Sequence, residues 1–243
     1  KGEDGVLGTA DDIDHRVAMV GFASGDNWNE NNYNYGNTEV FIGANQYRYG
    51  TSAQDVYASA FQSMNTTGGQ ANVQASIGAL TADGGTLTDL GLEMANGILN
   101  AKPVESGEQR NRVVIVFTDG QPGWSGYDSG VANNAIASAK AIKDAGATVY
   151  TVGIFDGANA SSAGNANGNN TERSNWFMQN MSSNNGTVQT PSYYLSASDS
   201  ETLNSIFQQI ADNIETGGTS STLTEDAVIK DVISEQFELP EGA

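Results

Sequence analysis

The chain has 243 residues, which is enough for one sizeable α/β domain with a short appendage and too few for two full domains. Its 10 Lys and Arg against 29 Asp and Glu give a formal charge of −19, and this acidity argues against binding to nucleic acid or to an anionic membrane surface. Because the chain has no cysteine, disulfides, thiol nucleophiles and thiolate metal sites are excluded.

The first half of the sequence predicts strands and helices in alternation. The apolar runs are of strand length, and the helices follow from apolar residues at a spacing of three and four. In chain order we expect a Gly- and Asp-rich loop over 1–14, a strand over 16–24, an irregular Asn- and Tyr-rich stretch over 26–37, a strand over 38–49, and helices over 53–64, 73–80 and 87–99.

The second half continues the alternation. We expect strands over 112–118, 147–155 and 193–195, helices over 131–145, 174–183 and 200–215, and an irregular Gly- and Asn-rich stretch over 156–171. Strands that are apolar on both faces and alternate with helices are typical of a doubly wound, mostly parallel sheet with helices on both faces. The predicted fold class is therefore α/β.

The composition changes after residue 215. Residues 216–224 are a Gly/Ser/Thr linker, and 227–239 alternate as in the strands of a β-rich domain. We therefore expect one domain over 1–215 and the start of a second over 216–243. No signal peptide and no long apolar run precede the domain, so we expect the chain to be an internal piece of a longer protein.

Two loops of the predicted sheet carry oxygen ligands. Asp119 follows the strand 112–118 directly, and ligands of such sheets lie beyond the carboxyl ends of the strands. Thr86 follows two glycines and precedes a helix, where its hydroxyl can point into the same crevice. A carboxylate and a hydroxyl are hard donors that suit a magnesium ion retaining several waters. Each loop alone is also compatible with an ordinary turn, and the pair in this order is the more specific signal.

These loops belong to a longer pattern. The segments that carry it are residues 15–22, 84–92, 113–120, 147–155 and 194–198. Together they resemble a von Willebrand factor type A domain, of the kind found in surface proteins and pilus-tip adhesins of Gram-positive bacteria. The resemblance implies that Thr86 and Asp119 hold Mg²⁺, Mn²⁺ or Ca²⁺ at an adhesion site. It makes Thr88 either a fallback ligand or the cap of the following helix.

One part of the family pattern is missing. The Asp-x-Ser-x-Ser loop that closes the first strand of the family occurs nowhere in the 243 residues. The resemblance therefore implies that the first strand and helix are missing from this chain. Because a sheet without its central strand exposes unpaired backbone, we expect an N-terminal segment of the same protein to complete it.

The function implied by the resemblance is adhesion. We expect a metal-dependent module of a cell-wall-anchored, extracellular surface or pilus protein, which binds an acidic residue of a host or partner protein. The alternative is a structural stalk domain without an active metal site. An enzyme is not expected, because nucleotide-binding and phosphate-binding motifs are absent and His15 is the sole histidine.

Two further regions have a possible binding role. Trp28, Tyr33 and Tyr35 lie in the irregular stretch 26–37, where they would either form part of a ligand-binding rim beside the metal or belong to a mobile surface loop. The acidic loop over residues 4–14 has enough carboxylates to hold calcium, but it does not match the spacing of an EF-hand, and a solvated acidic loop remains the alternative.

Overall fold

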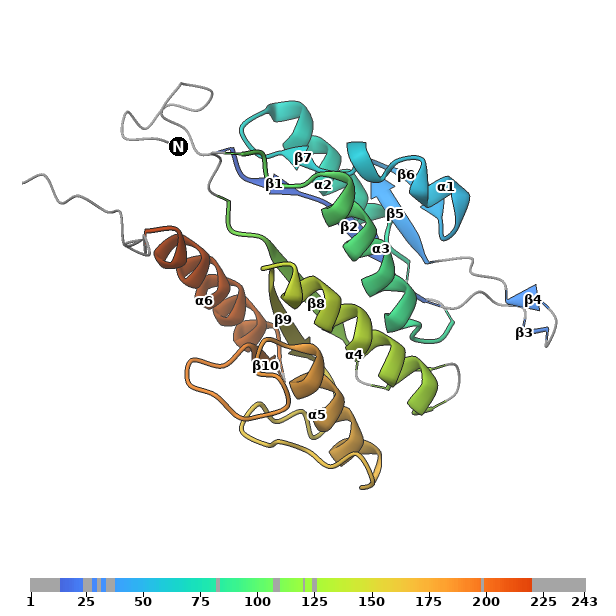
Figure 1. Cartoon of the computed structure of the whole chain (residues 1–243), viewed down its shortest axis with the longest axis vertical. Coiled ribbons are helices and arrows are strands. Elements are labelled where there is room, and N and C mark those ends of the chain that lie inside the picture. Colours follow the sequence, from blue (N-terminus) through green and yellow to red (C-terminus); the bar gives the residue numbers. More distant parts are fainter. Residues whose placement is uncertain are drawn as a thin grey trace, which may run out of the picture.

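The computed structural model describes residues 14–23, 28–29, 32–33, 38–81, 84–106, 110–119, 121–123, 126–197 and 199–219. The strands are β1 (Arg16–Val17), β2 (Met19–Gly21), β3 (Trp28–Asn29), β4 (Asn32–Tyr33), β5 (Glu39–Ile42), β6 (Asn45–Arg48), β7 (Gln62–Ser63), β8 (Val113–Thr118), β9 (Thr148–Gly153) and β10 (Tyr194–Ser196). The helices are α1 (Thr51–Gln54), the 3₁₀-helix η1 (Tyr57–Ser59), α2 (Thr67–Ala79), α3 (Thr88–Ala101), α4 (Ser129–Asp144), α5 (Asn170–Met181) and α6 (Ser200–Thr219). Figure 1 shows their arrangement.

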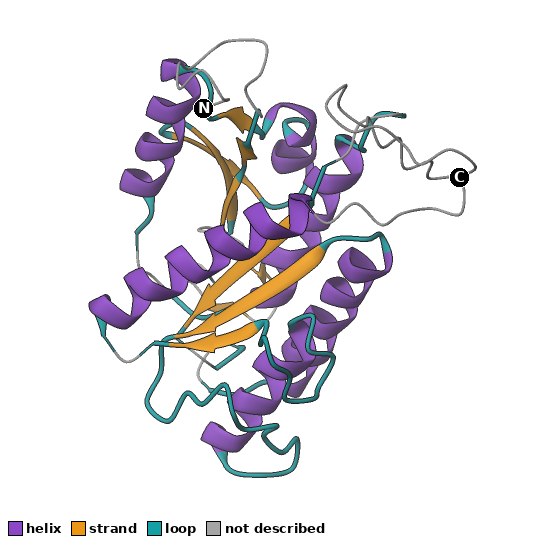
Figure 2. Ribbon diagram, turned by 90° about the vertical axis from the view of Figure 1, so that its left-hand side faces the viewer, coloured by secondary structure: helices purple, strands orange, loops and turns teal. Residues whose placement is uncertain are grey.

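The first sheet is parallel and has the strand order β10-β9-β8. The central strand β9 is buried along nearly its whole length. On one face Val149 packs into a core with α4 and α5, and on the other face Val152 packs into a core with Ile206 and Ile210 of α6. Figure 2 shows helices on both sides of these strands. The predicted α/β class is confirmed, with helices and a parallel three-stranded sheet.

The second sheet is antiparallel and has the order β2-β5-β6. The sequence predicted a single strand over 38–49, but Gly43 has φ +61° and turns the chain, so this segment is a β5–β6 hairpin. A third apolar core lies beneath this sheet and contains Val40, Met94 and Ile98. Within the described residues, the two three-stranded sheets are separate and do not form the single sheet expected from the sequence.

Two predicted elements differ from the structure because of long-range pairing. The run 16–24 divides into β1 and β2, and β1 pairs antiparallel with β7. The predicted helix 53–64 is instead α1, η1 and β7. Ala53 and Ala60 lie in the apolar core, so the spacing of apolar residues correctly indicated which side of the segment is buried. The segment is not one helix, because residues 62–63 pair as a strand with β1.

Helices α3, α4 and α6 follow the sequence closely, whereas α2 begins six residues before the predicted 73–80 and α5 begins four residues before the predicted 174–183. Several of the helices have recognisable caps. Asp128 caps α4, where its carboxylate accepts bonds from the backbone nitrogens of Gly130 and Val131. Asn169 and Glu172 form a capping box at the start of α5. Helix α6 extends to Thr219, four residues beyond the predicted end at 215. None of the helices in the described part of the chain is long and apolar enough to cross a membrane.

Candidate functional site

The loop before α3 and the loop after β8 are joined by a pair of backbone hydrogen bonds. The Thr86 nitrogen donates to the Gly123 oxygen at 2.7 Å, and the Gly123 nitrogen donates to the Thr86 oxygen at 2.9 Å. Gly123 has φ +130°, and a Cβ there would lie 2.5 Å from the Gly126 oxygen, so only glycine fits. The structure thus brings together the two loops that the sequence identified separately.

Asp119 lies at the carboxyl end of β8 with its side chain exposed. The preceding residue, Thr118, accepts a hydrogen bond from the Ile154 nitrogen at 2.9 Å, which fixes the end of β8 against the end of β9. The carboxylate therefore stands at the edge of the parallel sheet, as predicted, and is open to solvent. Ile154 beside it is 42% exposed.

Thr88 does not cap the helix as the sequence suggested. It is the first residue of α3, the N-cap position is Leu87, and no side chain caps this end. The Thr88 side chain is fully buried, and its hydroxyl has no hydrogen-bond partner among the described residues. A buried hydroxyl without a partner is costly, so this one indicates a polar contact that the described residues do not supply.

Asp89 is a neighbour of the site to which the sequence assigned no role. Its carboxylate accepts a hydrogen bond from the Leu90 nitrogen at 3.0 Å. Burial raises the pKa of the Asp89 carboxyl, while the hydrogen bonds from Leu90 and from Asn134 of α4 act in the opposite direction. The sequence feature that could have identified Asp89 is its position directly after the Thr86-x-Thr88 pair.

The loop after Gly123 is fixed to the helices behind it. The Asp128 nitrogen donates to the Pro122 oxygen at 2.7 Å. The Arg173 guanidinium lies 4.8 Å from the centre of the Tyr127 ring, and the Tyr127 ring meets Phe177 edge-on at 6.4 Å between centroids. These contacts hold the loop in one position on α5, so the Thr86–Gly123 bridge has a firm support.

The donors at this edge suit a hard divalent cation. No three His, Cys, Asp or Glu side chains lie together as metal ligands within the described part of the chain. A cation at Thr86 and Asp119 would therefore need most of its ligands from water or from another segment. Mg²⁺ accepts such an arrangement because it binds through few carboxylates and retains several waters.

The predicted ligand rim is described only in its backbone. Trp28 pairs with Tyr33 in the small β3–β4 hairpin, and the side chains of both residues lie outside the described part of the structure, as does Tyr35. The acidic loop proposed for calcium also lies outside it, apart from Asp14. The role of these residues stays a prediction.

Of the predicted irregular stretch 156–171, residues 156–169 form neither helix nor strand, and α5 begins at Asn170. The stretch is held by α5 and β10. The Asn175 side chain accepts a hydrogen bond from the Asn159 nitrogen at 2.8 Å and another from the Tyr194 hydroxyl at 2.7 Å. The Gln179 side chain donates to the oxygens of Ala160 and Ser162, at 3.0 Å each. A fixed polar loop therefore begins directly after the exposed Ile154.

Comparison with protein families decides the classification. The model of the von Willebrand factor type A domain matches residues 31–209, which is more than half of the chain. The chain belongs to this family. The match includes Thr86, Gly123 and Asp119, so both loops of the candidate site lie in the family's domain. No match was found among curated proteins.

The type A domain is also similar to solved structures of the pilus adhesin SpaC from Lactobacillus rhamnosus GG. One structure aligns with a TM-score of 0.46 at 18% identity, and the open conformation aligns with a TM-score of 0.43 at 19% identity. Each alignment covers 65% of this chain and 23% of the SpaC chain. The chain thus spans less than a quarter of the solved adhesin.

Proposed function

We propose that this type A domain is a metal-dependent adhesion module. The observation that carries the proposal is the bridge between Thr86 and Gly123, because it holds a hydroxyl loop against the loop that follows Asp119. The family membership and the similarity to a pilus adhesin agree with it. No nucleophile and base in the described residues suggest an enzyme, and none is proposed.

The proposed cation is Mg²⁺, with Mn²⁺ or Ca²⁺ as substitutes. Thr86 would hold it through its hydroxyl and Asp119 through its carboxylate, directly or through water. Such an ion, held by few charges, attracts an acidic side chain at an open coordination position. Asp119 and the fixed loop 121–123 would position the ion. The exposed Ile154 would give apolar contact to the partner segment that carries the acidic residue.

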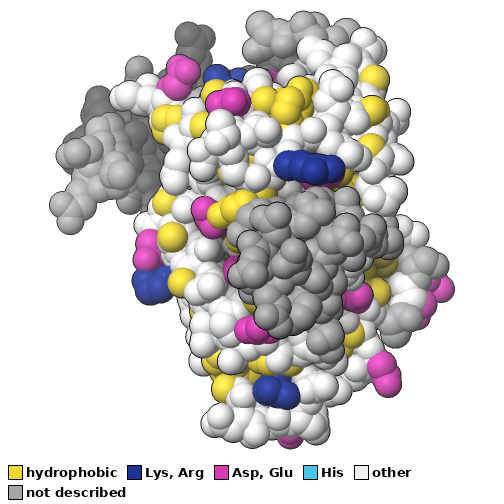
Figure 3. Space-filling view, turned by 90° about the vertical axis from the view of Figure 1, so that its right-hand side faces the viewer, with side chains coloured by type: hydrophobic (Ala, Val, Ile, Leu, Met, Phe, Trp, Pro, Cys, Tyr) yellow, Lys and Arg dark blue, Asp and Glu magenta, His cyan; other side chains and the backbone are white. Residues whose placement is uncertain are grey.

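The proposed ligand is an acidic residue of an extracellular host or partner protein. The formal charge of −19 would repel such a partner at long range, but physiological salt screens charges beyond about 8 Å. Figure 3 shows one face of the molecule on which acidic side chains are scattered and basic ones are few. A bound cation would therefore reverse the charge locally. Trp28, Tyr33 and Tyr35 are proposed to contact the ligand at the rim.

The proposed location is the surface of a Gram-positive cell, in a pilus or another cell-wall-anchored protein, because the similar SpaC is a pilus adhesin. We also propose that an N-terminal segment of the same protein adds the first strand of the family pattern, which would precede residue 1. That segment would bring the further oxygen ligands that the described residues lack.

Thermal unfolding with and without metal, measured with the proposed N-terminal strand present, tests the proposed function. Mg²⁺ at about 10 mM should raise the melting temperature relative to EDTA by a few degrees, because an ion that binds only the folded state stabilises it. Asp119→Ala should remove the shift. Asp144→Ala is the matched control, since Asp144 is an exposed carboxylate at the far end of α4. No shift, or an equal shift in Asp119→Ala, would favour a stalk domain without a metal site.

A further inference from the structure

The antiparallel sheet carries a small pocket on the face that α2 covers. Helix α2 contacts both β2 and β5 (Figure 1). Glu39 of β5 lies directly opposite Gly21 of β2, and Phe41 projects from the same face of β5 two residues later. The pocket has a volume of about 60 Å³, and its walls include Phe22, Phe41 and Leu80, the residue that ends α2. Glu39 also lines it.

The pocket depends on a glycine in β2. A Cβ on Gly21 would lie 2.9 Å from the Phe41 ring and 3.1 Å from the Leu80 side chain, so any larger residue would take up this space. The backbone around the pocket is held by the fully buried Thr38. Its hydroxyl accepts a hydrogen bond from the Ala23 nitrogen at 3.1 Å and donates one to the Ala23 oxygen. The pocket is therefore built into the folded sheet.

Glu39 is a nearly buried carboxylate with a distant partner. Its side chain is 8% exposed, and the Arg48 Nε lies 3.8 Å from its Oε1, which is too long for a hydrogen bond. The Arg48 side chain is itself 68% exposed. Burial raises the pKa of the Glu39 carboxyl, and the charge of Arg48 acts in the opposite direction. Because a carboxylate removed from water is costly without a close partner, this one favours a donor in the pocket beside it.

The size and lining of the pocket select the group that fits it. One water molecule requires about 10–15 Å³ of such volume, so the pocket holds a chain of about four or five heavy atoms. The side chains of Phe22, Phe41 and Leu80 suit methylene groups, and Glu39 suits a positive charge at the end of the chain. A divalent cation would need several oxygen ligands, which these apolar side chains do not supply. An alkylammonium group matches both the volume and the charge.

We propose that this pocket binds a lysine side chain of a partner protein, with the ammonium group on Glu39 and the methylene groups against Phe41 and Leu80. Lysine carries a compact ammonium on a four-carbon stem, which is the length that the pocket accepts. The formal charge of −19 attracts a basic segment to the chain. The site is separate from the proposed metal site and does not depend on it.

The rim of the pocket indicates which residues flank the lysine. Leu80 is 43% exposed, and Ile77, about one turn earlier on α2, is 56% exposed. The printed sequence of α2, from Thr67 to Ala79, contains no charged residue. Exposed apolar side chains on an uncharged helix favour contact with apolar residues of a partner. The lysine is therefore expected in an apolar setting, with leucine-like neighbours that pack on Ile77 and Leu80.

Titration with n-butylammonium tests the pocket, because this ion is the lysine side chain without its backbone. Amide spectra of the 243-residue chain are recorded in EDTA, so that metal binding plays no part. The signals of Gly21, Phe22 and Leu80 should shift in a saturable manner, with half-saturation in the millimolar range. The control is n-butanol, which has the same stem without the charge and should bind at least tenfold more weakly. No saturable shift, or equal binding of the two compounds, would overturn the proposal.

Substitutions test the role of the charge. Glu39→Gln keeps the shape of the side chain and should weaken binding of n-butylammonium at least tenfold. Asp55→Asn, at an exposed carboxylate that ends α1, is the matched control and should leave binding unchanged. Arg48→Ala removes an exposed cation that competes for Glu39, so it should tighten binding several-fold even where Glu39→Gln does not fold. Unchanged binding in a folded Glu39→Gln chain, or weaker binding in Arg48→Ala, would contradict the assignment.

A leucine–lysine–leucine tripeptide with blocked ends tests whether the lysine of a protein can enter. It should bind at least as tightly as n-butylammonium, because its leucines can contact Ile77 and Leu80. The same peptide with an acetylated lysine side chain lacks the charge and should bind at least tenfold more weakly. Binding of n-butylammonium without binding of the tripeptide would show a site for a free amine and overturn the assignment to a partner protein. Because these titrations contain EDTA, their failure would leave the proposed metal site untouched.

Discussion

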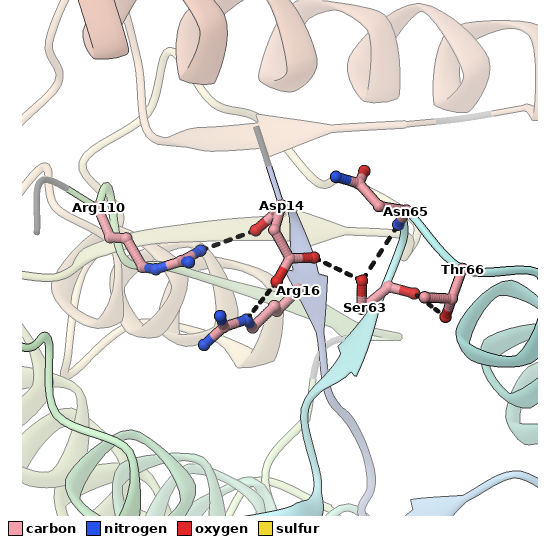
Figure 4. Close-up of polar contacts among 6 residues, drawn as sticks. All are labelled: Asp14, Arg16, Ser63, Asn65, Thr66 and Arg110. Atoms are coloured by element: carbon pink, nitrogen blue, oxygen red, sulfur yellow. Dashed lines mark hydrogen bonds and ion pairs between the residues drawn. The ribbon is translucent and has the colours of Figure 1, made fainter. Parts of the chain in front are cut away.

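Asp14 joins three parts of the chain through its carboxylate and its backbone oxygen. Its carboxylate accepts a hydrogen bond from the Ser63 hydroxyl of β7 at 2.5 Å and one from Arg16 of β1 at 2.7 Å, as Figure 4 shows. Its backbone oxygen accepts the bond from Arg110 before β8. The start of the domain is therefore tied through one aspartate to the β1–β7 pair and to the residue that leads into β8 of the parallel sheet.

The pKa of Asp14 makes this contact testable by pH. Burial acts to raise the pKa of the carboxyl, but the hydrogen bonds from Ser63 and Arg16 and the charges of Arg16 and Arg110 hold it below its ordinary value of 3.8. A carboxyl with a lowered pKa in the folded state stabilises it above the unfolded pKa, and this stabilisation is lost as the pH falls through the folded pKa.

Asp14→Asn should therefore lower the melting temperature at pH 7, with an effect on the free energy of unfolding of about 1 kcal/mol for a partly exposed group. The difference from the parent chain should shrink steadily below about pH 4, as the parent carboxyl becomes protonated. Melting curves from pH 7 down to pH 3 measure it. A difference that stays constant over this range would show that the charge of Asp14 is not what stabilises the contact.

Residue patterns in the sequence indicated the candidate site residues. They did not reveal the backbone contacts that hold the two loops together. Thr86 and Asp119 were predicted because a hydroxyl after two glycines and a carboxylate after a buried strand are visible in sequence. The bridge to Gly123 was not, because it depends on a backbone pairing 37 residues apart. The unpartnered hydroxyl of Thr88 was also beyond prediction, since a sequence does not show which polar atoms lose their partners on burial.

At the scale of elements, the segment after α5 is held by side-chain hydrogen bonds in place of regular structure. Asn184 is fully buried, and its amide donates to Gln179 at 2.6 Å and to Ser192 at 2.9 Å. Its side-chain oxygen accepts from the Tyr193 nitrogen at 2.8 Å, next to β10. This one side chain therefore fixes the path from α5 into the last strand of the parallel sheet.

Asn184→Ala should reduce the free energy of unfolding by about 2–4 kcal/mol, because it leaves several buried polar partners unsatisfied. Chemical denaturation of both chains measures this loss. Asn133→Ala, at an exposed position on α4, is the control and should change the value by less than about 0.5 kcal/mol. Equal losses in the two variants would mean that the buried amide has no special role.

Element prediction succeeded where local periodicity determines the structure. Helix α3 was predicted over 87–99 and is observed over Thr88–Ala101, because its apolar residues recur on one face. The segment 53–64 has a similar apolar spacing, but it is divided by the pairing of β7 with β1. That pairing joins residues 45 and 47 positions apart, so no local pattern of the segment could reveal it.

At the scale of the whole molecule, the sequence predicted the α/β class and the family, and the family model confirms the latter. It did not predict that the described strands form two three-stranded and two two-stranded sheets, with three apolar cores. Among the described residues, β2 pairs with β5 alone and β8 with β9 alone, so these two strands are the edges at which the three-stranded sheets end.

Binding of a divalent cation by Thr86 and Asp119 is the central claim, and paramagnetic broadening by Mn²⁺ tests it most directly. In an amide spectrum of the 243-residue chain, small additions of Mn²⁺ should broaden the signals of Thr86, Asp119 and Gly123 first, since broadening falls steeply with distance from the ion. Asp119→Ala should remove this selectivity, and Asp144→Ala should keep it. Broadening that leaves these three signals unchanged while others disappear would contradict the claim.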